Sequence, residues 1–244
     1  MGEIVLLRRA TLRVAFALAC ALIACLTLQI LPAKLKARVS GTEAISGAAR
    51  IIDGDTIEIK GERIRLNGID APETSQSCPS RWLGSWRCGD AAGHQLRKII
   101  QMRTVTCEGH ERDSYGRLIG TCFVEGRDIN AEMVRAGYAW AFTKYSDVYA
   151  GEQREAEAAK VGIWTADKPV KPAWDYRKQR WQSAQQTAPA GCAIKGNISH
   201  AGHIYHLPWS PWYDRVSIDT GRGERWFCNE AEAIAAGWRA ARFE

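Results

Sequence analysis

The sequence predicts an α+β domain that follows an apolar N-terminal segment and precedes a small C-terminal module. Two observations favour this fold class. Apolar and polar residues alternate through residues 50–66, as in β-strands, whereas residues 89–102 carry apolar residues at helical spacing. The chain has 244 residues, of which 46% are apolar, so it can bury a core of ordinary size. This composition excludes a disordered or fibrous protein.

The first 33 residues have the composition of a targeting segment. Three arginines precede an uncharged apolar run, residues 14–33. We expect residues 1–33 to be a signal peptide or an N-terminal membrane anchor, because about 20 apolar residues just suffice to span a bilayer. The protein is therefore expected to be extracytoplasmic: periplasmic, secreted or anchored to the membrane by this segment. Residues 34–48 are small and polar and are expected to form a linker.

Residues 49–174 are predicted to form the main domain. Ile57 and Ile59 alternate with charged residues, Gly61 and Glu62 mark a turn, and the alternation resumes after it, which predicts a hairpin with one apolar face. Further strands are expected at residues 104–107 and 118–124, and helices at residues 89–102, 129–136 and 149–161. The strands come first and the helices are inserted or appended, as in an α+β domain.

A second boundary is expected at residues 175–190, which are rich in Gln, Arg, Ser and Ala and form a predicted linker. Residues 191–244 then form a small module of short strands, with a closing helix from Asn229 to Ala241 that Asn229 caps. About fifty residues make a small core, so a disulfide would stabilise this module.

Six of the eight cysteines lie beyond the apolar segment, an even number that agrees with an oxidising compartment. Cys107 and Cys122 stand symmetrically about the turn-forming residues 113–116, so a hairpin with that turn would place them opposite each other. Chain order suggests two further local bridges. A metal site is the alternative use of cysteines, but no Cys-x-x-Cys spacing favours it. The expected pairs are Cys78 with Cys88, Cys107 with Cys122, and Cys192 with Cys228.

Three carboxylates and two arginines of the main domain suit phosphodiester chemistry. Asp55 and Asp70 each end a β segment and together could supply oxygen ligands to one hard divalent cation. Glu73 follows the stiff Pro72 and could orient or deprotonate a water molecule. Arg65 and Arg117 offer guanidinium groups for bidentate contact with phosphate oxygens. Alone, each has an ordinary structural explanation, such as a turn at Asp55 or a solvated strand arginine at position 65.

The three motifs that hold these residues closely resemble the staphylococcal nuclease family: Ile52-Asp53-Gly54-Asp55-Thr56-Ile57, Ile64-Arg65-Leu66-Asn67-Gly68-Ile69-Asp70-Ala71-Pro72-Glu73-Thr74, and Tyr115-Gly116-Arg117. The resemblance implies a five-stranded OB-type β-barrel with helices. It also implies that Asp55, Asp70 and the carbonyl of Ala71 bind Ca²⁺, that Glu73 acts on the attacking water, and that Arg65 and Arg117 hold the phosphate. Tyr115 resembles a family tyrosine near the nucleotide. At the position of another active-site tyrosine this chain has Phe142.

The resemblance leads us to expect an extracytoplasmic Ca²⁺-dependent endonuclease that hydrolyses DNA or RNA and leaves 3'-phosphate ends. The net charge of +6 favours a polyanionic partner without requiring one. The alternative is a non-catalytic envelope protein whose barrel binds nucleic acid or an acidic polysaccharide. A binder would need the arginines but not Glu73, so the motif favours the enzyme.

Two regions carry additional expectations. The excursion between Cys78 and Cys88 contains Trp82 and Trp86, which could shield the site, extend the substrate groove by stacking on bases, or simply pack in the loop. The C-terminal module resembles the sunset domain of extracytoplasmic bacterial proteins, through Ile194-Lys195-Gly196-Asn197-Ile198 and Gly223-Glu224-Arg225-Trp226-Phe227-Cys228. That resemblance implies no established chemistry, and no protein partner follows from it.

Overall fold

The computed structural model describes residues 42–82, 84–144 and 146–241. The predicted signal peptide or anchor, residues 1–33, lies outside this range, as does most of the predicted linker at residues 34–48. None of the helices formed by the described residues is both long and apolar enough to cross a membrane.

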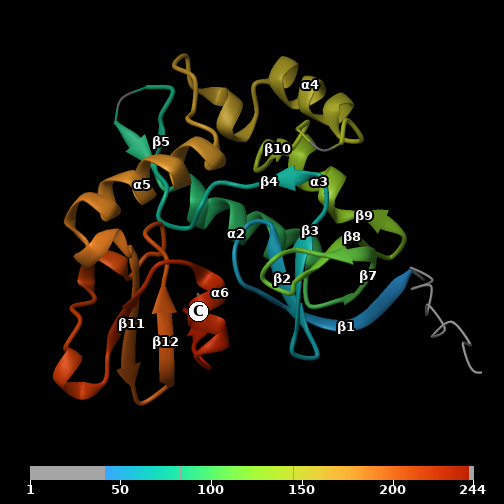
Figure 1. The fold of residues 1–244 in the computed structure, drawn as a ribbon. Coiled ribbons are helices and arrows are strands. Elements are labelled where there is room, and N and C mark those ends of the chain that lie inside the picture. Colours follow the sequence, from blue (N-terminus) through green and yellow to red (C-terminus); the bar gives the residue numbers. More distant parts are fainter. Residues whose placement is uncertain (1–41, 83, 145, 242–244) are drawn as a thin grey trace, which may run out of the picture. The chain divides into compact units, whose positions relative to one another are not determined.

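Five strands close into a β-barrel (Figure 1), namely β1 (Glu43–Ile51), β2 (Thr56–Ile59), β3 (Glu62–Leu66), β7 (Thr104–Arg112) and β8 (Leu118–Val124). The strands follow the order β3-β2-β1-β7-β8, and a parallel pairing of β3 with β8 closes the barrel. The short strand β9 (Arg127–Asp128) pairs with the end of β8. The isoleucines that alternate in the sequence point inward, since Ile57, Ile59 and Ile64 are fully buried. The predicted α+β barrel is therefore confirmed.

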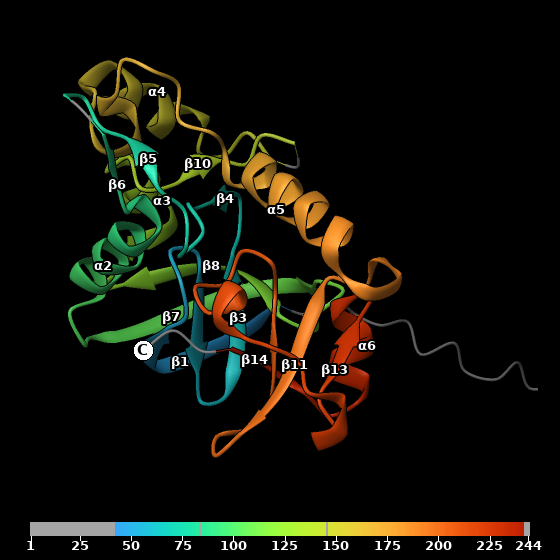
Figure 2. The same cartoon turned by 90° about the vertical axis from the view of Figure 1, so that its left-hand side faces the viewer.

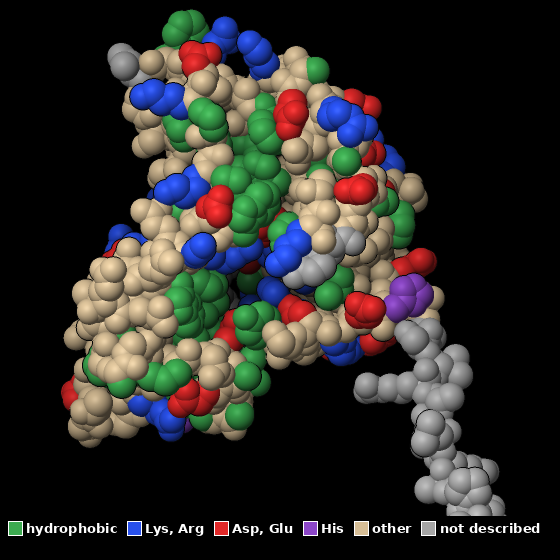
Figure 3. Space-filling model, turned by 45° about the horizontal axis from the view of Figure 1, so that its top comes forward, with side chains coloured by type: hydrophobic (Ala, Val, Ile, Leu, Met, Phe, Trp, Pro, Cys, Tyr) green, Lys and Arg blue, Asp and Glu red, His purple; other side chains and the backbone are tan. Residues whose placement is uncertain are grey.

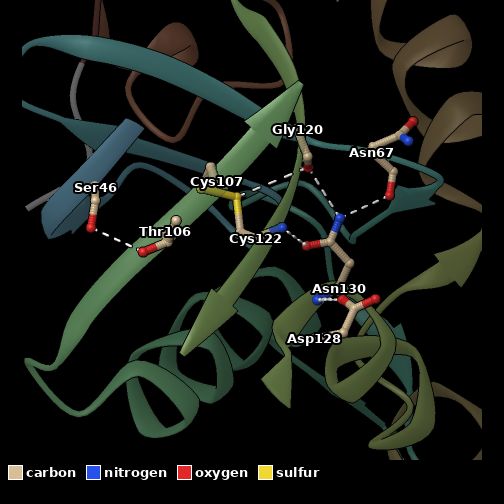
Figure 4. Close-up of a disulfide and its surroundings, with 8 residues drawn as sticks. All are labelled: Ser46, Asn67, Thr106, Cys107, Gly120, Cys122, Asp128 and Asn130. Carbon is tan, nitrogen blue, oxygen red and sulfur yellow. Dashed lines mark hydrogen bonds between the residues drawn. A yellow bond between two sulfur atoms is a disulfide. The ribbon is translucent and has the colours of Figure 1, made fainter. Parts of the chain in front are cut away.

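Strand β1 begins at Glu43, inside the segment expected to be a linker. The segment lacks an apolar alternation because its side chains are exposed or half-buried. Its order comes from backbone pairing with β7, where Glu43 lies opposite Gly109 and Ala48 opposite Thr104. One side-chain contact supports this pairing, the hydrogen bond of 2.9 Å between the hydroxyl groups of Ser46 and Thr106 (Figure 4).

Three helices of the barrel domain lie close to their predicted positions: α2 (Cys88–Ile100), α3 (Ile129–Arg135) and α4 (Ala150–Ala159). Helix α2 crosses beside the barrel strands (Figure 2), and its Leu96, Ile99 and Ile100 join the main hydrophobic core. The buried Asn130 of α3 connects three segments through its amide group. It accepts a hydrogen bond from the N–H of Cys122 and donates to the carbonyls of Asn67 and Gly120 (Figure 4).

Two pairs of very short strands complete the barrel domain. Strand β4 (Ile69–Asp70) pairs with β10 (Trp140–Ala141), which places Asp70 opposite Trp140. Strand β5 (Cys78–Pro79) pairs with β6 (Ser85–Trp86) in the excursion that the sequence predicts as a small loop. A 3₁₀ turn, Gly162–Thr165, follows α4.

The segment expected to be a linker at residues 175–190 is instead mostly helical. Helix α5 spans Ala173–Thr187; Ala173 and Ala184 are its buried residues, and Trp174 and Trp181 are half-buried. The helix therefore has no broad apolar face, which is why its sequence resembles a linker. Two short 3₁₀ turns, Tyr213–Arg215 and Thr220–Arg222, occur later in the chain.

The C-terminal module is a four-stranded sheet of order β13-β11-β12-β14 with one helix. Its core contains Ile194, Tyr205, Phe227 and Trp238. Asn229 caps helix α6 as predicted, accepting a hydrogen bond from the N–H of Glu232. The helix ends at Ala235 rather than at Ala241, because the chain turns at Gly237, with φ of 80°, into β14. The elements are β11 (Ile194–Ser199), β12 (Gly202–His206), β13 (Arg225–Phe227), α6 (Glu230–Ala235) and β14 (Arg239–Ala240).

Three disulfides link the cysteines in the pairs expected from the sequence: Cys78–Cys88, Cys107–Cys122 and Cys192–Cys228. Cys107 and Cys122 are direct neighbours in the pairing of β7 with β8, with their Cα atoms 4.0 Å apart. Three bridges in one chain indicate an oxidising, extracytoplasmic environment.

Candidate active site

The carboxylates of Asp55 and Asp70 meet at one guanidinium group. Asp55 follows the loop between β1 and β2, and Asp70 lies in β4; both side chains are buried. Arg65 of β3 donates from one terminal nitrogen to Asp55 and from the other to Asp70. Asp55 also accepts a hydrogen bond of 2.6 Å from the N–H of Ala71. Four of the predicted site residues thus form one connected cluster.

Close packing explains the glycine in the motif that carries Asp55. A Cβ atom added at Gly54 would lie 2.7 Å from the Cβ atoms of both Ala71 and Ala92. Only glycine allows the loop before β2 to approach helix α2 and the segment after β4 this closely. The approach keeps Asp55 next to the N–H of Ala71.

Glu73 is fixed by its backbone. Its carbonyl accepts a hydrogen bond of 2.6 Å from the N–H of Gln76, and its N–H donates to the Gln76 side chain at 3.2 Å. The N–H of Gly89, at the start of α2, donates in turn to the carbonyl of Gln76. A side chain at Gly89 would collide with the Glu73 carbonyl, since its Cβ would lie 1.7 Å from that oxygen. We call residues 73–76 the catalytic loop, after the role that the sequence predicts for Glu73.

Arg177 of α5, which the sequence motifs do not include, joins the cluster. Its guanidinium group donates to both oxygens of Asp70, at 3.0 and 2.9 Å, and to Glu73 at 2.6 Å. It therefore connects a predicted metal ligand to the predicted water-activating residue. Arg177 stands among other charged residues in the helix sequence, so no motif marks it as a site residue. Its partner Glu73 lies 104 residues earlier in the chain.

The hairpin between β7 and β8 carries Arg117 and Tyr115. The carboxylate of Asp113 accepts hydrogen bonds from the N–H groups of Tyr115 and Arg117, at 2.9 and 3.0 Å. It also pairs with the guanidinium group of Arg117 at 2.7 Å. That group lies over the Tyr115 ring, 5.4 Å from its centre. Asp113, a second residue absent from the predicted set, thus holds the turn and orients its arginine.

A cavity of about 1020 Å³ brings both parts together. Arg65 and Glu73 line it on one side, Tyr115 and Arg117 at the hairpin, and Arg177 on α5. Lys and Arg side chains (blue) gather in a hollow between areas of hydrophobic side chains (green) in Figure 3. Asp55 and Asp70 lie beneath the lining and are almost fully covered.

The two tryptophans of the disulfide loop do not belong to this cavity. Trp86 packs edge-on against Tyr138, with ring centres 6.3 Å apart, and its indole nitrogen donates to the carbonyl of Pro79. Trp82 is 83% exposed. Neither tryptophan lines the cavity. Trp86 therefore packs within the loop, and neither residue extends the substrate groove. Phe142, which stands where the family has a tyrosine, does line the cavity.

Burial changes the acidity of two carboxyl groups at the site. It raises the pKa of Asp55 to about 6, although the nearby Arg65 opposes the rise. It raises the pKa of Glu73 to about 8, and here Arg177 opposes it. The guanidinium groups of Arg65 and Arg177 are themselves desolvated, but the surrounding carboxylates outweigh burial and raise their pKa values. Both arginines therefore stay charged at any pH that the fold tolerates.

Comparisons with known proteins identify the barrel domain. The sequence pattern of the family described as staphylococcal nuclease homologue matches residues 63–166. An uncharacterized endonuclease of Escherichia coli O157:H7 is 38% identical over 137 residues, which cover 53% of this chain and 83% of that protein. The chain belongs to the staphylococcal nuclease homologue family.

Other relatives of this nuclease homologue carry different names. The succinoglycan biosynthesis protein ExoI of Rhizobium meliloti strain 1021 is 42% identical over 127 residues, 51% of this chain and 66% of that protein. A probable staphylococcal-like nuclease of Oryza sativa subsp. japonica is 30% identical over 129 residues, 52% of this chain and 36% of its own length. All these matches cover only about half of the present chain.

The C-terminal module matches a different family from the one its motifs suggest. The pattern described as ArfC matches residues 178–240, which include most of α5 and the four-stranded sheet. The resemblance to the sunset domain is therefore not supported. Short stretches such as Gly-Glu-Arg-Trp-Phe-Cys form only a strand and a cysteine. Unrelated small modules share these features, so such motifs do not identify a family.

Proposed function

We propose that this nuclease homologue is a Ca²⁺-dependent phosphodiesterase that cleaves DNA or RNA outside the cytoplasm. One observation carries the proposal: buried carboxylates, a third carboxylate in the catalytic loop and three arginines converge on a single cavity. Burying Asp55 and Asp70 is costly even though arginines pair with both, and a protein that only binds an anionic polymer has no use for such carboxylates.

The donor set suits a hard cation. Asp55 and Asp70 contact the same guanidinium group, so their oxygens lie close enough to share one ion. Among the described residues, no group of three or more His, Cys, Asp or Glu side chains is arranged to hold a metal. Ca²⁺ would therefore need main-chain and water oxygens as well, which it commonly accepts. Ala71, between the carboxylates, is the proposed main-chain ligand. Bound there, Ca²⁺ would supply charge against the phosphate oxygens.

The remaining residues have roles that follow from their positions. Glu73, held rigidly at its backbone, orients a water molecule and takes its proton. Arg65 and Arg117 hold the phosphate from the carboxylate side and the hairpin side of the cavity. Tyr115, stacked under Arg117, contacts the neighbouring nucleotide. The Arg177 side chain pairs with both Asp70 and Glu73 and so holds these two carboxylates together.

The runner-up is a non-catalytic protein that binds an anionic polymer. It is favoured by Arg177, which pairs with one of the two carboxylate oxygens of Glu73. One relative is also named for succinoglycan biosynthesis rather than for a nuclease. In this alternative Glu73 has only a structural role as the partner of Arg177.

Digestion assays separate the two proposals. The full-length protein is incubated with plasmid DNA, single-stranded DNA and RNA, in Ca²⁺ and in chelator. We expect cleavage in Ca²⁺ alone, with 3'-phosphate ends. Binding without cleavage in Ca²⁺, Mg²⁺ or Mn²⁺ would favour the binding protein. Asp70→Asn is the control: it should lose the cleavage, whereas cleavage by a contaminating nuclease would remain unchanged.

A further inference from the structure

The cavity extends well beyond the predicted catalytic residues. Its volume of about 1020 Å³ is at the upper end for pockets that hold one small ligand. One wall belongs to the barrel domain. The other wall is formed by α5 and by residues 207–212 of the C-terminal module. We call residues 207–212 the tryptophan loop. The second wall contains Trp181, Trp209 and Trp212.

The tryptophan loop is attached directly to the catalytic loop. The hydroxyl group of Ser75, two residues after Glu73, donates to the carbonyl of Trp209 at 2.5 Å and contacts the hydroxyl of Tyr176 at 3.0 Å. Arg180 of α5 donates to the carbonyl of Pro208 at 2.8 Å. These contacts hold the backbone of the tryptophan loop beside the catalytic loop and α5.

Of the three rings in this wall, Trp212 is exposed, whereas Trp181 and Trp209 are half-buried. Trp181 and Trp209 lie with ring centres 6.1 Å apart and planes inclined by 45°, so they form an angled pair rather than a closed stack. Trp212 is 41% exposed, and Arg215 covers it at 5.4 Å. Exposed aromatic rings beside positive charge are the surface on which unpaired bases stack in single-strand binding proteins.

Basic side chains line the cavity together with the tryptophans, which suits the phosphates and bases of a nucleic acid strand. Arg177 and Lys178 of α5 both line it, and Arg177 pairs with the carboxylate cluster. Acidic side chains also line it, but those nearest the module are engaged: Asp113 pairs with Arg117, and Glu230 accepts a hydrogen bond from the hydroxyl of Tyr205. Phosphates therefore meet arginines, and the bases on one side meet indole rings.

We propose that α5 and the tryptophan loop form a base-binding subsite, in which Trp209 and Trp212 stack on unpaired bases of a nucleic acid strand. This inference rests on the proposed nuclease function. In a duplex the bases are paired and stacked inside the helix, so they cannot reach Trp209 or Trp212. A single strand can turn its bases outward while its phosphates remain on the arginines.

Binding without catalysis tests the subsite. A fluorescent oligothymidylate of about 12 nucleotides matches the site size of single-strand binding folds. Its anisotropy, and that of the matching duplex, is measured with full-length protein in chelator. We expect tighter binding of the single strand. Trp212→Ala and Trp209→Ala should each weaken it about tenfold, the scale of one lost stacking contact. Trp82→Ala removes an exposed tryptophan outside the cavity and should change nothing.

The outcomes separate this inference from the proposed function. Equal affinity for duplex and single strand, or wild-type affinity in both cavity variants, overturns the subsite even if the protein cleaves DNA. Selective, tryptophan-dependent binding by a protein that cleaves nothing in Ca²⁺ overturns the nuclease and leaves the subsite standing. If Trp209→Ala melts at a lower temperature than wild type, the exposed Trp212→Ala decides alone.

Discussion

Asp70 is fully buried and bound by two arginines, whereas Arg117 stands at an exposed turn and is held by one aspartate. These residues represent two halves of the candidate site. The carboxylate half consists of Asp55, Asp70 and Glu73. Asp55 and Asp70 are buried in the barrel domain, and the backbone of Glu73 packs closely against Gly89 of helix α2. The hairpin half, Tyr115 and Arg117, depends on local contacts with Asp113.

The difference indicates which perturbations should be severe and which should be graded. In the carboxylate half the backbone is closely packed at Gly54 and Gly89, next to Asp55 and Glu73. In the hairpin half the arginine can move while the barrel stays intact. Chemistry that needs a fixed geometry is therefore assigned to the first half, and contact with a variable substrate to the second.

The largest effect is expected from Glu73→Gln. The amide keeps the size and polarity of the carboxylate but cannot accept a proton, so turnover in saturating Ca²⁺ should fall by about 100-fold or more. Affinity for nucleic acid should stay within a few-fold of wild type. Steady-state cleavage and anisotropy measure the two quantities. Turnover at the wild-type rate would remove the water-activating role from the carboxylate half.

A smaller loss is expected from Arg117→Lys. Lysine keeps the charge but not the bidentate fork, so the cleavage rate should fall by about tenfold. Stability should not change, because Arg117 is partly exposed. The kinetics are compared with those of Arg112→Lys, in which the altered arginine lies on the same hairpin but pairs with Glu43 and Glu62. Equal kinetics in the two variants would indicate only a general electrostatic role for position 117.

Removing Arg177 should strengthen metal binding rather than weaken it. The guanidinium group competes with a cation for Asp70 and Glu73, so Arg177→Met should strengthen Ca²⁺ binding several-fold. Isothermal titration without substrate measures this directly. Lys178→Met removes a neighbouring charge that makes no ion pair with these carboxylates and should have a smaller effect. Weaker Ca²⁺ binding in Arg177→Met would show that the arginine supports the metal site.

The smallest effect on activity is expected from the Cys107–Cys122 bridge. It lies fully buried in the barrel, and β8 is also held by its pairing with β3. Replacing both cysteines by alanine should lower the free energy of unfolding by about 3 kcal/mol, the value for a loop of this length. Cleavage below the melting temperature should stay within about twofold, because Asp113 still holds Arg117. A large loss of cleavage in a folded variant would mean that the bridge positions the hairpin half.

Features governed by local periodicity can be predicted from the sequence. The alternation of isoleucines predicts β2 and β3. A turn centred on Ser114 and Tyr115 predicts the register that joins Cys107 to Cys122. In the structure, the turn runs from Asp113 to Arg117, one residue longer, and a bulge between Gly109 and Glu111 restores the register. Two local irregularities therefore cancel.

Features that depend on tertiary contacts cannot be predicted in this way. Strand β1 has no alternation before Ala49 and is ordered by pairing with β7. Helix α5 is mostly polar and lacks a regular apolar stripe, so neither its helical state nor the approach of Arg177 to Asp70 follows from periodicity. The motifs contain all three residues of the carboxylate half and both residues of the hairpin half. Arg177 and Asp113 contact these residues only in the folded structure.

The central claim is that the carboxylate half, and not the hairpin half, binds the catalytic cation. Asp70→Asn and Asp113→Asn form a matched pair, since each removes one charge from an aspartate that binds an arginine. The measurement is the Ca²⁺ concentration that gives half-maximal cleavage. We expect Asp70→Asn to raise it by about tenfold or more and Asp113→Asn to leave it within about twofold. Equal shifts in the two variants, or a shift in Asp113→Asn alone, would contradict the account.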